Sequence, residues 1–156
     1  MEFISRSFTS FIVKETKKLE VIGMERKWGM RLIRVAAIFG LIGAILGSHM
    51  AGSMSYQFKP IHAHILVVGW LSVFAWGIFY SIFTLKKKAL VAIHGWTAMI
   101  GSIGLTIGMW LNTLKPFNIN STAALLIYII GGTVLLISFG LFILSTFMVE
   151  TKKERE

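Results

Sequence analysis

The sequence predicts an all-α integral membrane protein, an up-down bundle of four helices that each cross the bilayer. Three observations lead to this fold class. The 156-residue chain is 55% hydrophobic with a mean hydropathy of +0.73, which is too apolar for a soluble domain of this size. Charge-free stretches recur four times along it, and Lys and Arg are divided unequally among the segments between them. The length indicates a single domain.

Four apolar stretches without a charged residue define the predicted spans. They cover residues 35–58, 60–85, 89–114 and 116–149. Each can supply the roughly 20 apolar residues that cross about 30 Å of hydrocarbon, and a backbone in lipid must be helical to satisfy its own polar groups. We therefore expect helices near residues 32–53, 61–84, 89–111 and 122–148. The connections are short, so consecutive helices should be antiparallel neighbours.

The distribution of basic residues predicts the orientation of the bundle. Residues 1–34 carry eight Lys or Arg, while Lys86–Lys88 and residues 150–156 carry three each. The other two connections hold one lysine each, Lys59 and Lys115. Because cytoplasmic loops are enriched in Lys and Arg, both termini are predicted to be cytoplasmic.

The chain divides into three parts on this basis. Residues 1–30 hold four Glu and six Lys or Arg among apolar residues at roughly helical spacing. We interpret them as an amphipathic helix on the cytoplasmic membrane surface, or alternatively as a flexible segment. Residues 31–149 form the four-helix transmembrane domain, and residues 150–156 form a charged cytoplasmic tail. The basic residues flank apolar spans, which argues against nucleic acid as a partner despite the net charge of +9.

The composition also restricts the chemistry available inside the membrane. The chain has no cysteine and no aspartate, and no glutamate lies between Glu25 and Glu150. Thiolate metal sites, c-type haem attachment and carboxylate relays within the spans are therefore excluded. Histidine is the remaining side chain that binds a metal or a haem strongly.

Four histidines lie in the spans, where a titratable side chain is costly to bury and usually has a function. The predicted orientation places His49, His62 and His64 near the outer ends of the first two helices. His94 lies about 15 Å deeper, toward the cytoplasm. Imidazoles next to methionine thioethers suit haem iron or Cu(I), and Met50, Met54 and Met109 are at the outer level. His94 is either a hydrogen-bonded structural residue or a ligand.

The second span resembles a known helix. The run from Lys59 to Tyr80 contains His62, His64, Gly69-Trp70 and Phe79-Tyr80. It resembles the second helix of the large subunit of haem–copper oxidases and nitric oxide reductases. It is also similar to small four-helix membrane proteins described as cytochrome c oxidase subunit I-like. The resemblance covers roughly residues 31–112, with Arg34 in the first span and His94-Gly95-Trp96 in the third.

The resemblance implies a b-type haem with an axial histidine. The family's helix-two ligand matches His62, and Ala63-His64 stands where the family often has Thr-Asn, so His62 and His64 both remain candidates. The second ligand is open: His49, a second copy of the chain, or none, with a five-coordinate iron. The family's later helices, which carry the copper ligands, have no counterpart here, so complete oxidase activity is not expected.

We therefore expect a haem b-binding membrane protein in electron transfer or in handling a gas such as NO or O2. One alternative is a copper-binding membrane protein that uses His49, His62 and His64. The other is a non-catalytic structural or assembly subunit of a respiratory complex. The expected partners are the lipid bilayer and either further copies of the chain or a larger respiratory complex. The resemblance implies the inner membrane of a bacterium or an archaeon.

Overall fold

The structure, a computed structural model, describes residues 2–116 and 119–150, and the side chains from residue 23 onward. Across these residues the regular structure is helical apart from one isolated bridge between extended residues. Four helical segments are long and apolar enough to cross a membrane: Gly23–Ser53, Lys59–Ile82, Lys88–Leu114 and Ser121–Phe147. The predicted all-α class with four spans is confirmed, and these apolar helices indicate an integral membrane protein.

Helix α1 (Glu2–Ser53) is longer than the predicted first span. It begins at Glu2 and continues without a break through residue 32, because no proline occurs before Pro60. From residue 24 onward it has a buried face that includes Trp28 and Leu32, while Arg31 and Arg34 are exposed. Most side chains of the predicted amphipathic segment, residues 1–30, lie outside the described part of the structure. Residues 151–156 of the charged tail also lie outside it. The amphipathic segment and the tail therefore stay predictions.

The second span is one continuous helix made of three segments. Helix α2 (Lys59–His64) leads into the π-helical segment η1 (Ile65–Ser72), which continues as α3 (Val73–Ile82). Gly69 lies within the π-helical segment directly under the ring of Phe39 from α1, and a Cβ atom there would overlap the ring. The wider turn therefore coincides with the position where the Phe39 ring packs onto the backbone of the second span. A π-helical stretch was not predicted.

The last two spans end close to their predicted limits. Helix α4 (Lys88–Leu114) ends at Lys115, which has the left-handed conformation common after a helix, with φ of 47°. Helix α5 (Ser121–Phe147) begins after Asn120, whose side chain accepts a hydrogen bond from Thr122 N at 2.8 Å. This is the usual N-cap contact and fixes the start of the helix.

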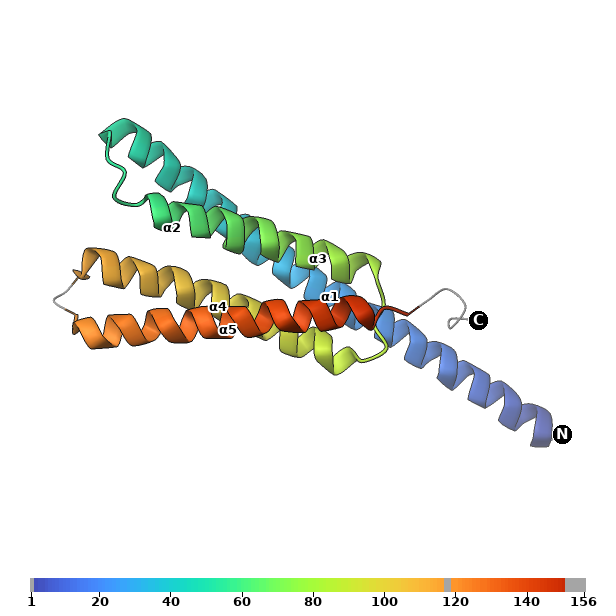
Figure 1. Ribbon diagram of the computed structural model, residues 1–156. Coiled ribbons are helices and arrows are strands. Elements are labelled where there is room, and N and C mark those ends of the chain that lie inside the picture. Colours follow the sequence, from blue (N-terminus) through green and yellow to red (C-terminus); the bar gives the residue numbers. More distant parts are fainter. Residues whose placement is uncertain (1, 117–118, 151–156) are drawn as a thin grey trace.

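The helices associate as two pairs, α1 with α2–η1–α3 and α4 with α5 (Figure 1). Within the second pair the backbones nearly touch. A Cβ atom on Gly104 would lie 3.1 Å from Gly131 Cα, and one on Gly131 would overlap Gly104 C and Leu105 N. Small residues permit such close approach of membrane helices, where packing rather than the hydrophobic effect drives association.

The two ends of the bundle differ. At the bridged end (residues 23–30, 83–94 and 138–150), Leu85 pairs with Val149 in an isolated antiparallel bridge. The backbone N–H of Lys86 donates to Met148 O, and that of Glu150 donates to Thr84 O, both at 2.9 Å. At the open end (residues 39–65, 106–116 and 119–125) the two pairs diverge (Figure 1). The bundle is therefore held together at one end and split at the other.

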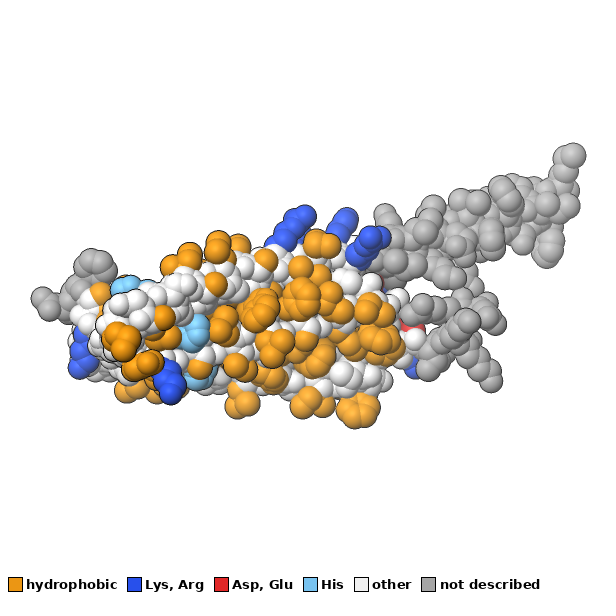
Figure 2. All heavy atoms as spheres, turned by 90° about the horizontal axis from the view of Figure 1, so that it is seen from above, with side chains coloured by type: hydrophobic (Ala, Val, Ile, Leu, Met, Phe, Trp, Pro, Cys, Tyr) orange, Lys and Arg blue, Asp and Glu red, His pale blue; other side chains and the backbone are white. Residues whose placement is uncertain are grey.

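The outer surface is largely apolar. Figure 2 shows hydrophobic side chains over most of one face, with Lys and Arg in separate groups to either side. Ile38, Leu136 and Phe147 are 59%, 72% and 81% exposed. Such a surface matches a hydrocarbon environment, because an apolar exterior of this extent is unusual for a protein in water.

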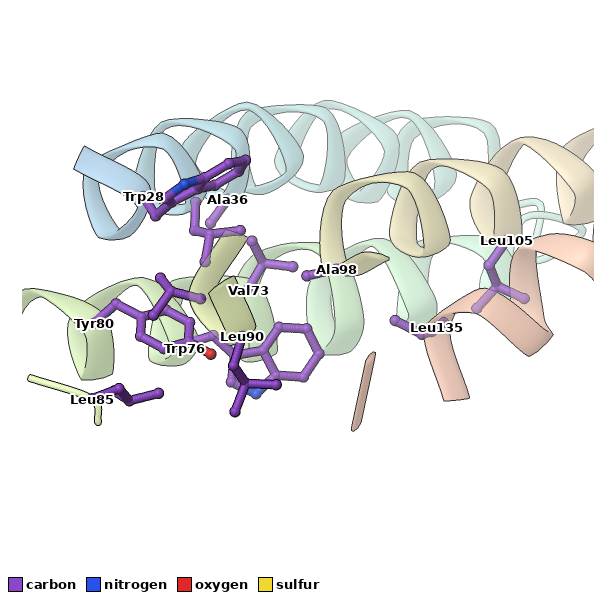
Figure 3. Packing of buried hydrophobic residues seen from close by; sticks show 12 residues of the cluster. Trp28, Ala36, Val73, Trp76, Tyr80, Leu85, Leu90, Ala98, Leu105 and Leu135 are labelled. Carbon is purple, nitrogen blue, oxygen red and sulfur yellow. The ribbon is translucent and has the colours of Figure 1, made fainter. Parts of the chain in front are cut away.

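The core joins the two pairs near the bridged end. Trp28, Leu32 and Ala36 of α1 pack with Val73, Trp76 and Tyr80 of α3 and with residues of α4, and Leu105 and Leu135 extend the cluster toward the open end (Figure 3). A smaller cluster of Phe39, Ile61 and Ile65 lies at the open end.

Candidate functional site

A groove opens between the two helix pairs at the open end. Its volume is about 560 Å³, within the range of pockets that bind small cofactors. The walls come from α1, α2, η1, α4 and the connection before α2. They consist of Phe39, Ile42, Ile45, Leu46, His49, Phe58, Ile61, Ile65, Thr106, Ile107 and Trp110. The groove is therefore apolar, with one imidazole and one hydroxyl in its lining.

The spacing of these residues explains how the groove forms. Phe39, Ile42, Leu46 and His49 recur every three or four positions, which places them on one face of α1. Because the helix pairs diverge here, that face does not reach α4 closely enough to close the gap. Residues that would be core in a tighter bundle instead line a cavity.

His49 is the only titratable side chain among the groove residues. It is exposed, and its ring stands edge-on to Phe58 with 6.1 Å between ring centroids. The hydroxyl of Thr106, in contrast, is already engaged with carbonyl oxygens of its own helix, at 2.8 Å from Ser102 O and 3.1 Å from Ile103 O. The imidazole of His49 is therefore the group in the groove that remains available to a ligand.

His62 and His64 do not line the groove. The His62 ring lies against Gly47 on a different face of α1, where a Cβ atom would be 3.0 Å from His62 Cε1. His62 Nδ1 is buried without a hydrogen-bond partner in the described part of the chain. His64 Nδ1–H donates to Pro60 O at 2.8 Å. The two predicted ligands of the second span, His62 and His64, therefore point in different directions, and neither lines the groove.

Across residues 23–116 and 119–150, no group of three or more His, Cys, Asp or Glu side chains is placed to hold a metal ion. The structure brings His49 to the groove and His62 to Gly47 in the same half of the bundle. It does not gather His49, His62 and His64 into one cluster.

His94 lies apart from these three, in a buried network at the bridged end. It is 0% exposed, and its Nδ1 is 2.8 Å from the hydroxyl of Tyr80. That hydroxyl is 3.0 Å from Ser145 Oγ, which donates to Leu141 O at 2.8 Å. Trp76 packs edge-on against the His94 ring, with 4.9 Å between centroids. One imidazole therefore connects α3, α4 and α5.

The direction of these hydrogen bonds assigns the tautomer of His94. Since the single proton of Ser145 is given to Leu141 O, the Tyr80 hydroxyl donates to Ser145 Oγ. Tyr80 then accepts from His94 Nδ1–H, which leaves Nε2 with a lone pair. Nε2 is buried and has no partner in the described part of the structure. The contacts of His94 are those of a structural histidine that joins helices.

Two features of this end were not predicted. Tyr80 and Ser145 are far apart in sequence, and their contact depends on how α3 and α5 pack. Glu25 was assigned to the N-terminal segment, but it is 2% exposed, and its Oε1 accepts a hydrogen bond from Leu85 N at 3.1 Å. The signal that could have marked Glu25 is its position three residues before Trp28, on the face of α1 that turns inward.

The fold and the groove define a class: an α-helical membrane protein with four spans and an apolar cavity that opens between its helix pairs. Comparisons with protein-family models, with curated proteins and with solved structures find no significant match to this chain. The resemblance to the haem–copper oxidase large subunit therefore has no support from these comparisons.

Proposed function

We propose that this protein binds b-type haem in the groove at its open end and acts in electron transfer or in the handling of a gas such as NO or O2. The observation that carries the proposal is the single imidazole of His49 in an otherwise apolar cavity of cofactor size. Haem is a flat apolar ring whose iron is commonly held by an axial histidine. When bound, it supplies a one-electron redox centre or an iron that binds a diatomic gas.

The other groove residues support this occupant. Phe39, Phe58 and Trp110 offer aromatic surfaces to a flat ring. Haem also carries two carboxylates that need cations or water. Lys59, the first residue of α2, and Lys115, directly after α4, are exposed at the same end of the bundle. The apolar walls would keep water from the iron, which influences its reduction potential.

In the proposed site His49, and not His62 or His64, is the first candidate for the axial ligand of the haem. The family likeness favours His62 or His64, whereas the lining of the groove favours His49. His62 remains a second candidate, because its buried Nδ1 lacks a partner in the described part of the chain. Substituting each histidine separately distinguishes these possibilities.

The experiment is an absorption spectrum of the protein purified from haem-replete cells, with pyridine-haemochrome analysis. We expect reduced-minus-oxidised bands of b-type haem. The His49→Ala variant should lose most of the haem, whereas His64→Ala should retain it, because His64 does not line the groove and its Nδ1–H donates to Pro60 O of its own helix. Loss of haem in His62→Ala but not in His49→Ala would refute the placement in the groove.

A colourless protein with normal helical content would refute haem binding altogether. Copper in that preparation, found by metal analysis, would favour the copper-binding alternative. A cofactor-free protein that co-purifies with a larger respiratory complex would favour a structural or assembly subunit.

We further propose that the four spans form an up-down bundle in a bacterial or archaeal inner membrane, with both termini cytoplasmic. Fourteen of the sixteen Lys and Arg residues lie in the segments assigned to the cytoplasmic side, which supports this orientation. The chain has no cysteine, so single introduced cysteines give a clean test. A membrane-impermeant maleimide applied from outside should label Ser121→Cys and leave Lys87→Cys unlabelled in intact cells. The reverse pattern would overturn the orientation.

A further inference from the structure

A second cavity, of about 410 Å³, lies between α1 and α3 at the bridged end. One part of its wall is polar and the other part is apolar. Glu25, Arg26 and Thr84 provide polar groups, whereas Met30, Ile78 and Ile82 provide an apolar surface. These three apolar residues are 42%, 38% and 64% exposed, so the cavity opens on the outer face of the helices. It is separate from the groove at the open end.

Glu25 lines this cavity, and one of its carboxylate oxygens lacks a hydrogen-bond partner in the described part of the structure. The residue is 2% exposed, and only Oε1 has a hydrogen bond, from Leu85 N. Oε2 is buried and has no hydrogen-bond partner in the described part of the structure. A buried carboxylate oxygen without a donor is costly, and most such groups in proteins are satisfied. The cavity therefore favours an occupant that brings a hydrogen-bond donor to Glu25.

Two further features restrict the charge of that occupant. The C-terminal end of α3 borders the cavity, because Ile82 and Phe83 line it, and the C-terminal end of a helix dipole favours a positive group. Arg26 also lines the cavity but is exposed, so its guanidinium offers a site for a negative group nearer to water. The polar part of the cavity is thus acidic where it is buried and basic where it is exposed.

We propose that this cavity binds a phospholipid with a primary-ammonium headgroup, of the phosphatidylethanolamine type. The ammonium donates to Glu25 Oε2, and the phosphate lies against Arg26. An acyl chain covers Ile78 and Ile82, which otherwise face the hydrocarbon. A choline headgroup carries no N–H and cannot make the bond to Glu25, although it has the same net charge. The site is independent of haem binding at the other end of the bundle.

The proposal is tested by native mass spectrometry of the protein released from micelles that contain equal amounts of three lipids. These lipids share one acyl composition and carry ethanolamine, choline or glycerol headgroups. We expect about tenfold greater retention of the ethanolamine lipid than of the choline lipid, which corresponds to about 1.4 kcal/mol at 25 °C. Equal retention of these two lipids, or preferential retention of the anionic glycerol lipid, would overturn the proposal.

Variants assign the preference to the cavity. Glu25→Gln should abolish it, whereas Glu150→Gln should leave it unchanged, because Glu150 is at the same end but outside the cavity. Arg26 is exposed, so Arg26→Gln should fold normally and still reduce retention, which keeps the test valid if Glu25→Gln does not fold. Unchanged retention of the ethanolamine lipid in Arg26→Gln would contradict the proposed phosphate contact. Displacement of the lipid by free ethanolamine at comparable concentration would contradict a phospholipid as the occupant.

Discussion

Replacing Gly131 with alanine tests the packing of α4 against α5 most directly. The added Cβ atom would overlap Gly104 C and Leu105 N and would lie 2.8 Å from Gly104 O. All three are backbone atoms of the facing helix, so no side chain can rotate away to make room. The helices themselves must separate.

The size of the effect follows from these distances. Carbon and oxygen atoms in contact are ordinarily about 3.5–4.0 Å apart, so α5 must move by roughly 1 Å at this crossing. Forcing an extra methyl group into a packed site typically costs about 1–3 kcal/mol. Alanine also favours a helix over glycine by about 0.5–1 kcal/mol. At Gly140 only the gain in helix propensity applies, because an added Cβ atom there meets nothing within 4 Å.

Gly140→Ala on the same helix is therefore a matched control. The gain in helix propensity is common to both variants, so we expect Gly131→Ala to be less stable than Gly140→Ala by about 1–3 kcal/mol. The measurement is unfolding of both variants in mixed micelles by titration with sodium dodecyl sulfate, followed by tryptophan fluorescence. If the two variants unfold at the same detergent fraction, the close approach of Gly104 and Gly131 is wrong.

Two further substitutions test the bridged end. Tyr80→Phe removes the hydrogen bond to His94 and should destabilise the protein by about 1–2 kcal/mol in the same titration. Tyr128→Phe should change little, because its hydroxyl makes no hydrogen bond to a described residue, and equal losses in both variants would contradict the network. Trp28→Ala should cost about 3–5 kcal/mol, since Trp28 is 6% exposed between the helix pairs. Trp110→Ala, 39% exposed in the groove, should cost clearly less, and the reverse order would mean that the core is misplaced.

The number of spans and most of their limits, except the start of the first span, could be predicted because they depend on local properties of the chain. A run without charges must be helical in lipid, and residues such as Asn120 and Pro60 mark where helices begin. The π-helical segment could not be predicted in this way. It coincides with the contact between Gly69 and Phe39, which are far apart in sequence and meet only when α1 packs on the second span.

The candidate site was predicted only in part for the same reason. The level of each histidine along the helices follows from counting residues, but the direction of each ring depends on packing. His49 and His62 belong to the same half of the bundle, yet one faces the groove and the other faces Gly47. The partnership of His94 with Tyr80 and Ser145 likewise requires three helices to be in place. The spans predicted from the sequence contain no carboxylate, but the first span of the structure, Gly23–Ser53, begins earlier than predicted and includes the buried Glu25.

The division of the bundle into a bridged end and an open end has a consequence for assembly. The hydrogen bonds of the Tyr80 network and the aromatic contacts around Trp76 are all at the end remote from the groove. None of them needs a ligand in the groove in order to form. Under the proposed function, the chain would therefore reach its final helix arrangement first and bind haem afterwards. The haem would then not be required for the helices to pack at the bridged end.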